Sequence, residues 1–226
     1  MLRRESGPIV KICGLSSAEH ARVAARSGAD LLGFILAPSR RQVTHATVCA
    51  IRDELDNGPV RRPPFVGVFV NPSREQVDCA IEEAGIGYVQ LSGEEEPALA
   101  GAIEIPYIRA IRIGPETSAD DALRLADRWM SLPHAPQLVL VDAAVAGSYG
   151  GSGQRANWAV ARQLAERYPT LLAGGLDPDN VAAGLAQTGA AGVDVSSGVE
   201  ENGIKSAERI VRFIAAARPD VTSVDV

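Results

Sequence analysis

Cysteine is scarce in this chain of 226 residues, and its copies are too scattered to build a disulfide framework. The three cysteines are Cys13, Cys49 and Cys79, and none of them is part of a Cys-x-x-Cys spacing. An odd, sparse set of this kind suits a reducing cytoplasm. No group of His, Cys and Asp residues has the sequence spacing of metal ligands, so we predict no metal site.

Long apolar runs and long basic runs are also absent. The run from Leu31 to Ala37 is far too short to cross a bilayer, and the charged start Met1–Glu5 has no apolar run behind it to make a secretory signal. The 22 basic and 28 acidic residues are spread along the chain, so no basic stretch can follow a nucleic-acid backbone. We therefore expect a soluble, cytoplasmic protein with neither nucleic acid nor membrane as a partner. A small anionic ligand is compatible with the net charge, since a few backbone amides and one arginine suffice to bind it.

The chain does contain a regular alternation of short apolar segments with longer amphipathic ones. Eight segments have the composition of buried strands, and we predict them at 9–12, 31–36, 65–70, 88–91, 107–111, 138–141, 171–173 and 193–195. Each is followed by a predicted helix, and these run from the N-cap Ser16 to Gly28, then 44–55, 71–83, 97–103, 118–129, 157–168, 178–187 and 205–217. Eight βα units predict a (β/α)8 TIM barrel in a single domain over residues 1–226, with its core at about 9–217 and a frayed polar tail at 219–226.

Two residues at predicted strand ends are candidates for chemistry, because loops at the carboxyl edge of a parallel barrel converge on ligands. Asp142 ends the sixth strand and Cys13 ends the first. A turn-capping role for Asp142 is an equally good interpretation of the stretch alone. Lys11 shares a strand face with Cys13, where its ammonium would favour the thiolate, but an outward and solvated Lys11 is equally compatible with the sequence.

The loops after the seventh and eighth strands are rich in small residues, which leave backbone N–H groups exposed to a ligand. Barrels often bind phosphate between these two loops, and we expect this role for Gly174, Gly175, Ser196, Ser197 and Gly198. The glycine-rich stretch 150–153 lacks the Lys-Ser/Thr of a Walker A loop and is better interpreted as a mobile lid. We expect the three histidines to be solvated and the two other cysteines, Cys49 and Cys79, to be small core residues.

Several motifs, taken in order, resemble the phosphoribosylanthranilate isomerase family. The likeness runs from about Ile9 to Ala217, and the motifs together are far more specific than any one alone. They are 11–15 (KICGL), 66–71 (VGVFVN), 89–91 (VQL), Asp142 with 150–153 (GGSG), 173–181 (AGGLDPDNV) and 193–200 (VDVSSGVE).

The resemblance implies an aldose–ketose isomerase of tryptophan biosynthesis. It would convert N-(5'-phosphoribosyl)anthranilate to 1-(2-carboxyphenylamino)-1-deoxyribulose 5-phosphate by an Amadori rearrangement, with acid and base groups and no cofactor or metal. It implies that Asp142 is the general acid and Cys13 the general base. It also implies that Arg41 pairs with the anthranilate carboxylate, with Arg40 as its rival, and that Asp194 either accepts a bond from a sugar hydroxyl or makes a structural ion pair. We expect a monomer or homodimer whose partner is this phosphorylated small molecule.

Two departures from the family pattern stand out. Ser92 occupies the place of a histidine that many relatives carry after the fourth strand, and Asn157 replaces an aspartate before Trp158. Asparagine is still a good helix cap. Other phosphate-binding barrels are less compatible with the sequence, because Cys13 replaces the expected aspartate of a phosphoribosyl-formimino isomerase and Lys11 and Lys205 are too few for an indole-glycerol-phosphate synthase. A phosphosugar-binding or protein-binding barrel without catalysis stays an alternative.

Overall fold

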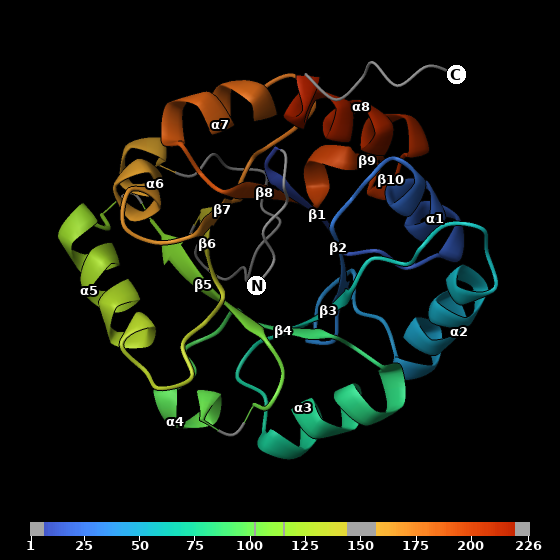
Figure 1. The fold of residues 1–226 in the computed structure, drawn as a ribbon, viewed down its shortest axis with the longest axis horizontal. Helices are drawn as coiled ribbons and strands as arrows, with labels where there is room; N and C mark the ends of the chain where they lie inside the picture. The colour runs from blue at the N-terminus through green and yellow to red at the C-terminus, as the bar shows by residue number, and fades with distance from the viewer. Residues whose placement is uncertain (1–6, 102, 115, 144–156, 220–226) are drawn as a thin grey trace.

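The computed structural model describes residues 7–101, 103–114, 116–143 and 157–219. Its eight parallel strands form a closed barrel in sequence order, which confirms the predicted architecture (Figure 1). The predicted lid at 150–153 and the tail beyond Pro219 lie outside the described residues. The barrel strands are β1 (Ile9–Cys13), β2 (Leu31–Ile35), β3 (Phe65–Phe69), β4 (Tyr88–Leu91), β5 (Tyr107–Ile113), β6 (Leu138–Ala143), β7 (Thr170–Leu172) and β8 (Gly192–Val195).

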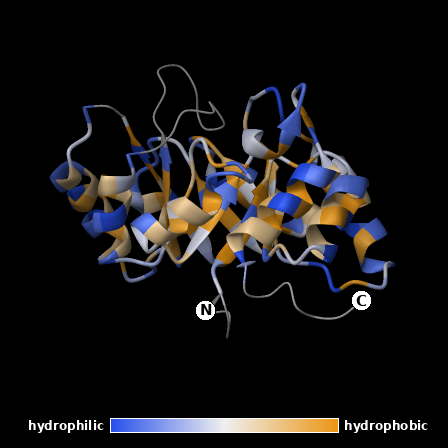
Figure 2. Cartoon of the chain, turned by 90° about the horizontal axis from the view of Figure 1, so that it is seen from above, coloured by the Kyte–Doolittle hydropathy of each residue, from blue (hydrophilic) through white to orange (hydrophobic). Residues whose placement is uncertain are grey.

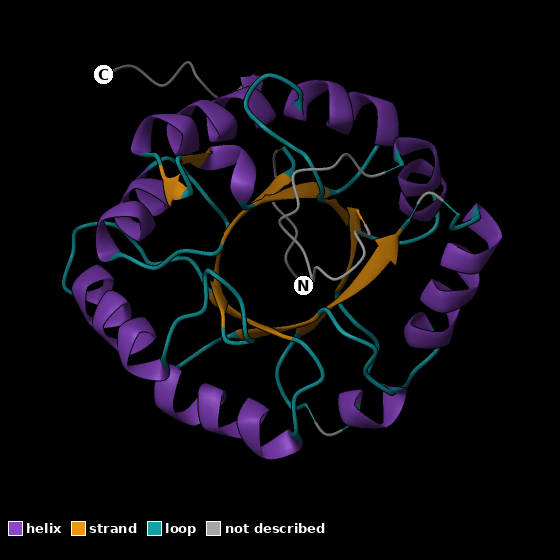
Figure 3. Cartoon of the chain, turned by 180° about the vertical axis from the view of Figure 1, so that it is seen from behind, coloured by secondary structure: helices purple, strands orange, loops and turns teal. Residues whose placement is uncertain are grey.

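Helices surround the barrel on all sides and bury its outer face (Figure 3). They are α1 (Ala18–Arg26), α2 (His45–Asp56), α3 (Arg74–Cys79), α4 (Pro97–Ala100), α5 (Ala119–Met130), α6 (Trp158–Ala165), α7 (Val181–Thr188) and α8 (Ala207–Ala217). Hydrophobic residues gather toward the strands and hydrophilic ones toward the outside of the helices (Figure 2). No helix among the described residues is long and apolar enough to span a bilayer.

The barrel interior is layered, because alternate residues of each strand point inward. Its lower part is an apolar cluster made largely of residues near the strand starts, including Ile9, Leu31, Tyr88, Leu138 and Leu171. Further along the same strands the inward positions become polar: Cys13 follows Lys11 on β1, and Asp194 occupies β8. The apolar layers therefore form a floor beneath a polar mouth at the carboxyl ends.

Local details differ from the predicted boundaries. Ser17, and not Ser16, is the N-cap of α1, because its side chain accepts the His20 N–H. The predicted helix at 71–83 is α3 followed by a π-helical turn, η1 (Ala80–Ala84). The predicted start of the last helix at Lys205 was wrong. A small hairpin, β9 (Glu200–Glu201) and β10 (Ile204–Lys205), follows the 3-10 turn η2 (Ser197–Val199), and α8 begins only after the N-cap Ser206.

A buried ion pair ties together the loops after β3 and β4. The Arg109 guanidinium on β5 binds the Glu95 carboxylate, donates to the Gly93 carbonyl at 3.0 Å and lies 4.5 Å from the centre of the Trp129 ring system. The same carboxylate accepts the backbone N–H groups of Asn71 and Gly93, both at 2.9 Å. These charge-assisted bonds hold two loops of the mouth in fixed positions.

Candidate active site

The carboxyl ends of the strands enclose one cavity, and residues of seven strands line it. Its lining includes Cys13 of β1, Gln90 of β4, Arg112 of β5, Asp142 of β6 and Asp194 of β8. The first and sixth strands therefore present Cys13 and Asp142 to the same space. In the ring of eight strands β7 and β8 separate β6 from β1, so the thiol and the carboxyl group approach that space from different sides.

Cys13 belongs to a buried chain of polar groups that starts at the first strand. Lys11, which is 0% exposed, donates from Nζ to Oδ1 of Asp194 at 2.8 Å, and the two residues are partners in the β1–β8 ladder. The inward alternative for Lys11 is therefore the one found. A β-carbon on Gly33 of β2 would lie 2.9 Å from the Cys13 sulfur and 3.1 Å from Lys11 Nζ, so the absence of a side chain there makes room for both groups.

The electrostatics of this group of side chains differ from the prediction that Cys13 is readily ionised to a thiolate. Burial raises the pKa of the Cys13 thiol, and Asp194 raises it further, while Lys11 lowers it. Burial also opposes the charge on Lys11, but Asp194 and the thiol outweigh burial and raise the pKa of the lysine. The site therefore favours the Lys11 ammonium, which is paired with Asp194, and disfavours ionisation of the neighbouring thiol.

Asp142 lies at the mouth end of β6, half-buried, and its ladder partner on β5 is Arg112. Both residues line the cavity. Arg112 was not among the residues predicted for the site. The sequence does contain a pattern that points to it, because Arg112 follows Ile108 and Ala110 at the two-residue period of inward-facing strand positions.

Gln90 contributes a polar atom that the protein leaves unsatisfied. Its Nε2 donates to Ser92 Oγ at 3.0 Å, whereas its Oε1 is buried and has no hydrogen-bond partner among the described residues. Ser92, at the position where many relatives carry histidine, thus orients the Gln90 amide. A buried carbonyl oxygen without a donor costs about 1–3 kcal/mol, so a ligand that supplies a donor would be favoured here.

The two predicted phosphate loops are in contact. A β-carbon on Gly198, at the 3-10 turn after β8, would lie 1.7 Å from the backbone oxygen of Leu176, which belongs to the loop after β7. Only glycine allows this close approach of the two backbones. Within the described chain, the N–H groups of Gly174, Gly175, Ser197 and Gly198 have no acceptor. Free N–H groups on adjoining loops, two of them in the first turn of a helix, form a suitable anion site.

The two arginines of the loop after β2 have different surroundings. Arg41, with a side chain 10% exposed, lines the cavity and donates from Nε to Glu200 Oε1 at 2.6 Å and from Nη2 to Oε2 at 3.0 Å. Arg40 also binds Glu200, at 2.8 Å, but its side chain is 55% exposed and it is not among the residues that line this cavity. Between the two candidates the geometry thus favours Arg41 as a ligand contact.

Glu200 and Lys205 are polar residues of this region that sequence reasoning missed. The Lys205 Nζ donates to Glu200 Oε1 and to the Ser196 carbonyl, each at 2.8 Å. Burial acts to raise the pKa of Glu200, but hydrogen bonds from Arg41 and Lys205 outweigh it and lower that pKa to about 2. Burial lowers the pKa of Lys205, against the opposing effect of Glu200. The β9–β10 hairpin thus holds a charged cluster at the edge of the cavity.

Other predicted properties of single residues were wrong. Cys49 and Cys79 are half-buried rather than core residues. His45 is not simply solvated, because its Nδ1 lies 2.8 Å from a Glu83 carboxylate oxygen. Together with Cys79, these two residues form a group whose donor atoms all lie within 4.8 Å of one another, although their sequence spacing resembles no metal motif.

Comparisons with known proteins cover nearly the whole barrel. The family model for N-(5'-phosphoribosyl)anthranilate isomerase matches residues 10–216. A protein of that name from Roseiflexus castenholzii is 42% identical, over 93% of this chain and 98% of its own. The crystal structure of phosphoribosyl anthranilate isomerase from Thermus thermophilus is 36% identical with a TM-score of 0.76, covering 92% of this chain and 97% of that one.

A further solved structure was determined with a ligand. It is phosphoribosyl anthranilate isomerase in complex with reduced 1-(o-carboxyphenylamino)-1-deoxyribulose 5-phosphate, and it is 29% identical with a TM-score of 0.77 over 94% of this chain and 99% of that one. Sequence and fold thus agree along almost the entire length, and the chain belongs to the N-(5'-phosphoribosyl)anthranilate isomerase family.

Proposed function

We propose that the protein converts N-(5'-phosphoribosyl)anthranilate to 1-(2-carboxyphenylamino)-1-deoxyribulose 5-phosphate, an aldose–ketose isomerisation of tryptophan biosynthesis. Family membership supports the reaction. The observation that carries the assignment to this chain's residues is the placement of Cys13 and Asp142 on two sides of one cavity. An Amadori rearrangement needs one acid and one base that reach the same sugar.

In this proposal Asp142 acts first, as the general acid. Its carboxyl group donates a proton to the furanose ring oxygen while the C1–O bond breaks, which gives an open-chain iminium ion. Cys13 then removes the proton from C2, and the electron pair of that C–H bond neutralises the iminium to form the enolamine. Tautomerisation of the enolamine to the ketone completes the reaction without a redox partner.

Lys11 stabilises the thiolate that this base requires. The resting thiol is neutral because it is buried, so only a fraction of the protein is ready to accept the C2 proton. The Lys11 ammonium lies beside the sulfur and lowers the cost of that thiolate. Because burial raises the pKa of Cys13, we expect the thiolate fraction to increase as the pH is raised toward that pKa.

The remaining groups orient the substrate. The free N–H groups at Gly174, Gly175, Ser197 and Gly198, together with Ser196, would bind the 5-phosphate. Arg41 would bind the anthranilate carboxylate through the guanidinium edge that Glu200 leaves open. The unsatisfied Gln90 Oε1 would accept a bond from a sugar hydroxyl or the anthranilate nitrogen. The Asp194 carboxylate is held by Lys11, which favours its structural role.

We further propose that the chain works as a single domain in the cytoplasm, as a monomer or homodimer. All three cysteines are free, which suits a reducing compartment.

Loss of the intrinsic fluorescence of freshly made N-(5'-phosphoribosyl)anthranilate, on addition of the purified protein, tests the reaction. Asp142→Asn and Cys13→Ser should each lower turnover by a factor of roughly 100 or more, because each removes a proton-transfer group. Cys49→Ser is the matched control for the thiol and should keep full activity. Wild-type turnover in either of the first two variants would remove the corresponding acid or base from the proposal.

A further inference from the structure

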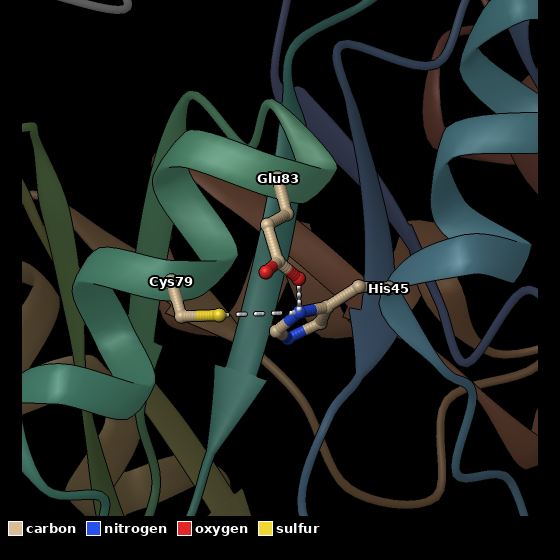
Figure 4. A group of neighbouring side chains, drawn as sticks. All are labelled: His45, Cys79 and Glu83. Carbon is tan, nitrogen blue, oxygen red and sulfur yellow. Dashed lines mark hydrogen bonds and ion pairs between the residues drawn. The ribbon is translucent and has the colours of Figure 1, made fainter.

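A second cluster of reactive side chains lies outside the barrel, between α2 and the π-helical turn that follows α3. His45 is the first residue of α2, Cys79 is the last residue of α3, and Glu83 lies one turn further on (Figure 4). The His45 Nδ1 atom is 2.8 Å from Glu83 Oε2 and 3.8 Å from the Cys79 sulfur. The proposed isomerisation uses none of these groups.

The geometry does not suit a nucleophilic cysteine. In a Cys–His–acid triad the acid binds one ring nitrogen and the nucleophile faces the other. Here the sulfur and the carboxylate oxygen both approach the same nitrogen of His45 (Figure 4). Three donor atoms from three side chains thus converge on a common point, which is the arrangement of ligands around a metal ion.

The distances fit a small tetrahedral ion. With Zn–S near 2.3 Å and Zn–N or Zn–O near 2.0 Å, tetrahedral ligand atoms stand roughly 3.3–3.6 Å apart. The two separations from His45 Nδ1, 2.8 and 3.8 Å, lie on either side of that range, and all three donor atoms lie within 4.8 Å of one another. Side-chain shifts of about an ångström would therefore complete the geometry. Sulfur, nitrogen and one carboxylate suit Zn2+, whereas Mg2+ and Ca2+ require oxygen ligands.

The backbone around the cluster is held in place by α2 itself. The Cys49 sulfur donates to the Glu83 carbonyl at 3.0 Å, and the Arg52 Nη1 donates to the same carbonyl at 3.4 Å. These contacts fix the π-helical turn against α2, and so fix Glu83 relative to His45. π-helical turns inside helices occur frequently at functional sites.

One side of the cluster is open to a cavity. His45 and Cys79 line a hollow of about 450 Å³ whose other walls include the apolar residues Leu36, Phe69 and Pro72. A three-ligand zinc ion here would have its fourth position facing this hollow, where water or a small ligand could bind.

We propose that His45, Cys79 and Glu83 form a zinc site with three protein ligands and an open fourth position. Binding would displace the thiol proton of Cys79, so affinity should fall as the pH is lowered. The side chain of Glu83 is 59% exposed and that of His45 29% exposed, so the ion can enter directly from solvent.

Co2+ titration of the chelator-treated, full-length protein tests the site, because cobalt bound to a thiolate gives a sulfur-to-metal charge-transfer band. We expect one equivalent of Co2+, displaced by Zn2+. Cys79→Ser should abolish the band and weaken Zn2+ binding by more than the roughly 10- to 100-fold that loss of an outer-shell partner costs. His45→Gln should weaken binding to the same extent.

Cys49→Ser is the matched control, because it removes a neighbouring sulfur that is not a proposed ligand, while the serine hydroxyl can still donate to the Glu83 carbonyl. It should keep the band and the affinity, and all three variants should keep the fold by circular dichroism. Absence of a charge-transfer band in the wild type would overturn the proposal, as would its persistence in Cys79→Ser. A band lost equally in Cys49→Ser would overturn the assignment of Cys79 as the sulfur ligand.

Discussion

Replacing Lys11 by methionine should destabilise the protein and make Cys13 harder to ionise at the same time. Lys11 is fully buried and its partner Asp194 has a side chain only 10% exposed, so solvent cannot screen the loss. Removing one member of a buried ion pair costs about 3–5 kcal/mol, because the remaining charge is left uncompensated. For a chain of this length that corresponds to a melting temperature lowered by roughly 6–20 °C.

The effect on the thiol follows from the balance of charges around it. Burial has the largest effect on the pKa of Cys13 and raises it. Lys11 lowers this pKa, and its effect is larger than the opposing effect of Asp194. Loss of the lysine removes the largest influence that lowers this pKa, while burial continues to raise it. The pKa of Cys13 should therefore rise further, and the thiolate fraction at neutral pH should fall.

Two measurements check this prediction. Urea unfolding gives the stability change, and the pH dependence of iodoacetamide alkylation, in a background with Cys49→Ser and Cys79→Ser, gives the pKa of Cys13. The double variant Lys11→Met with Asp194→Leu is the control for stability, since apolar replacement of a whole buried pair is often neutral. A decrease of less than about 1 kcal/mol in the free energy of unfolding of Lys11→Met would refute an ion pair of this strength. An alkylation profile that shifts to lower pH would refute the predicted rise in the pKa of Cys13.

Three further predictions concern the rim of the cavity. Gly198→Ala should raise KM roughly tenfold or more, because the new methyl group collides with the Leu176 carbonyl and separates the phosphate loops; an unchanged KM would place the phosphate elsewhere. Arg41→Ala should raise KM at a similar kcat, measured by the same fluorescence assay, while Arg40→Ala should change it little; the reverse ranking would reassign the carboxylate contact. Glu200 has a pKa lowered from 4.5 to about 2, so its contribution to stability is complete above pH 4.5 and is lost as pH falls toward 2. Glu200→Gln should therefore flatten the acid side of the stability curve in urea unfolding at several pH values, and an unaltered slope would contradict the ion pairs described.

The barrel could be predicted from the sequence because its signals are local. Each strand is a short apolar run and each helix has its own cap. Every loop that follows a strand lies at the carboxyl ends of the strands, so its place in the chain predicts that it borders the mouth of the barrel. The same logic placed Cys13 and Asp142 at one edge. The direction of Lys11 stayed open because strand periodicity alone does not say which face is inward, and only pairing with Asp194 across the β1–β8 ladder settles it.

What escaped prediction depends on contacts between residues that are distant in sequence. Glu200 meets Arg41 across 159 positions, and its hairpin consists of two-residue strands that show no periodicity. His45 and Cys79 lie 34 positions apart and meet only because α2 packs against the turn that follows α3. Neither contact leaves a pattern in the local sequence.

The apolar floor of the barrel separates the residues that stabilise the fold from the residues that line the cavity. Ile9, Leu31, Tyr88, Leu138 and Leu171 form an apolar layer near the strand starts, whereas the polar residues of the cavity lie at the carboxyl ends of the strands. Substitutions in that lower layer can change the melting temperature while the groups at the other end keep their positions. Thermal adaptation and change of substrate range can thus proceed at opposite ends of one cylinder, each with little effect on the other.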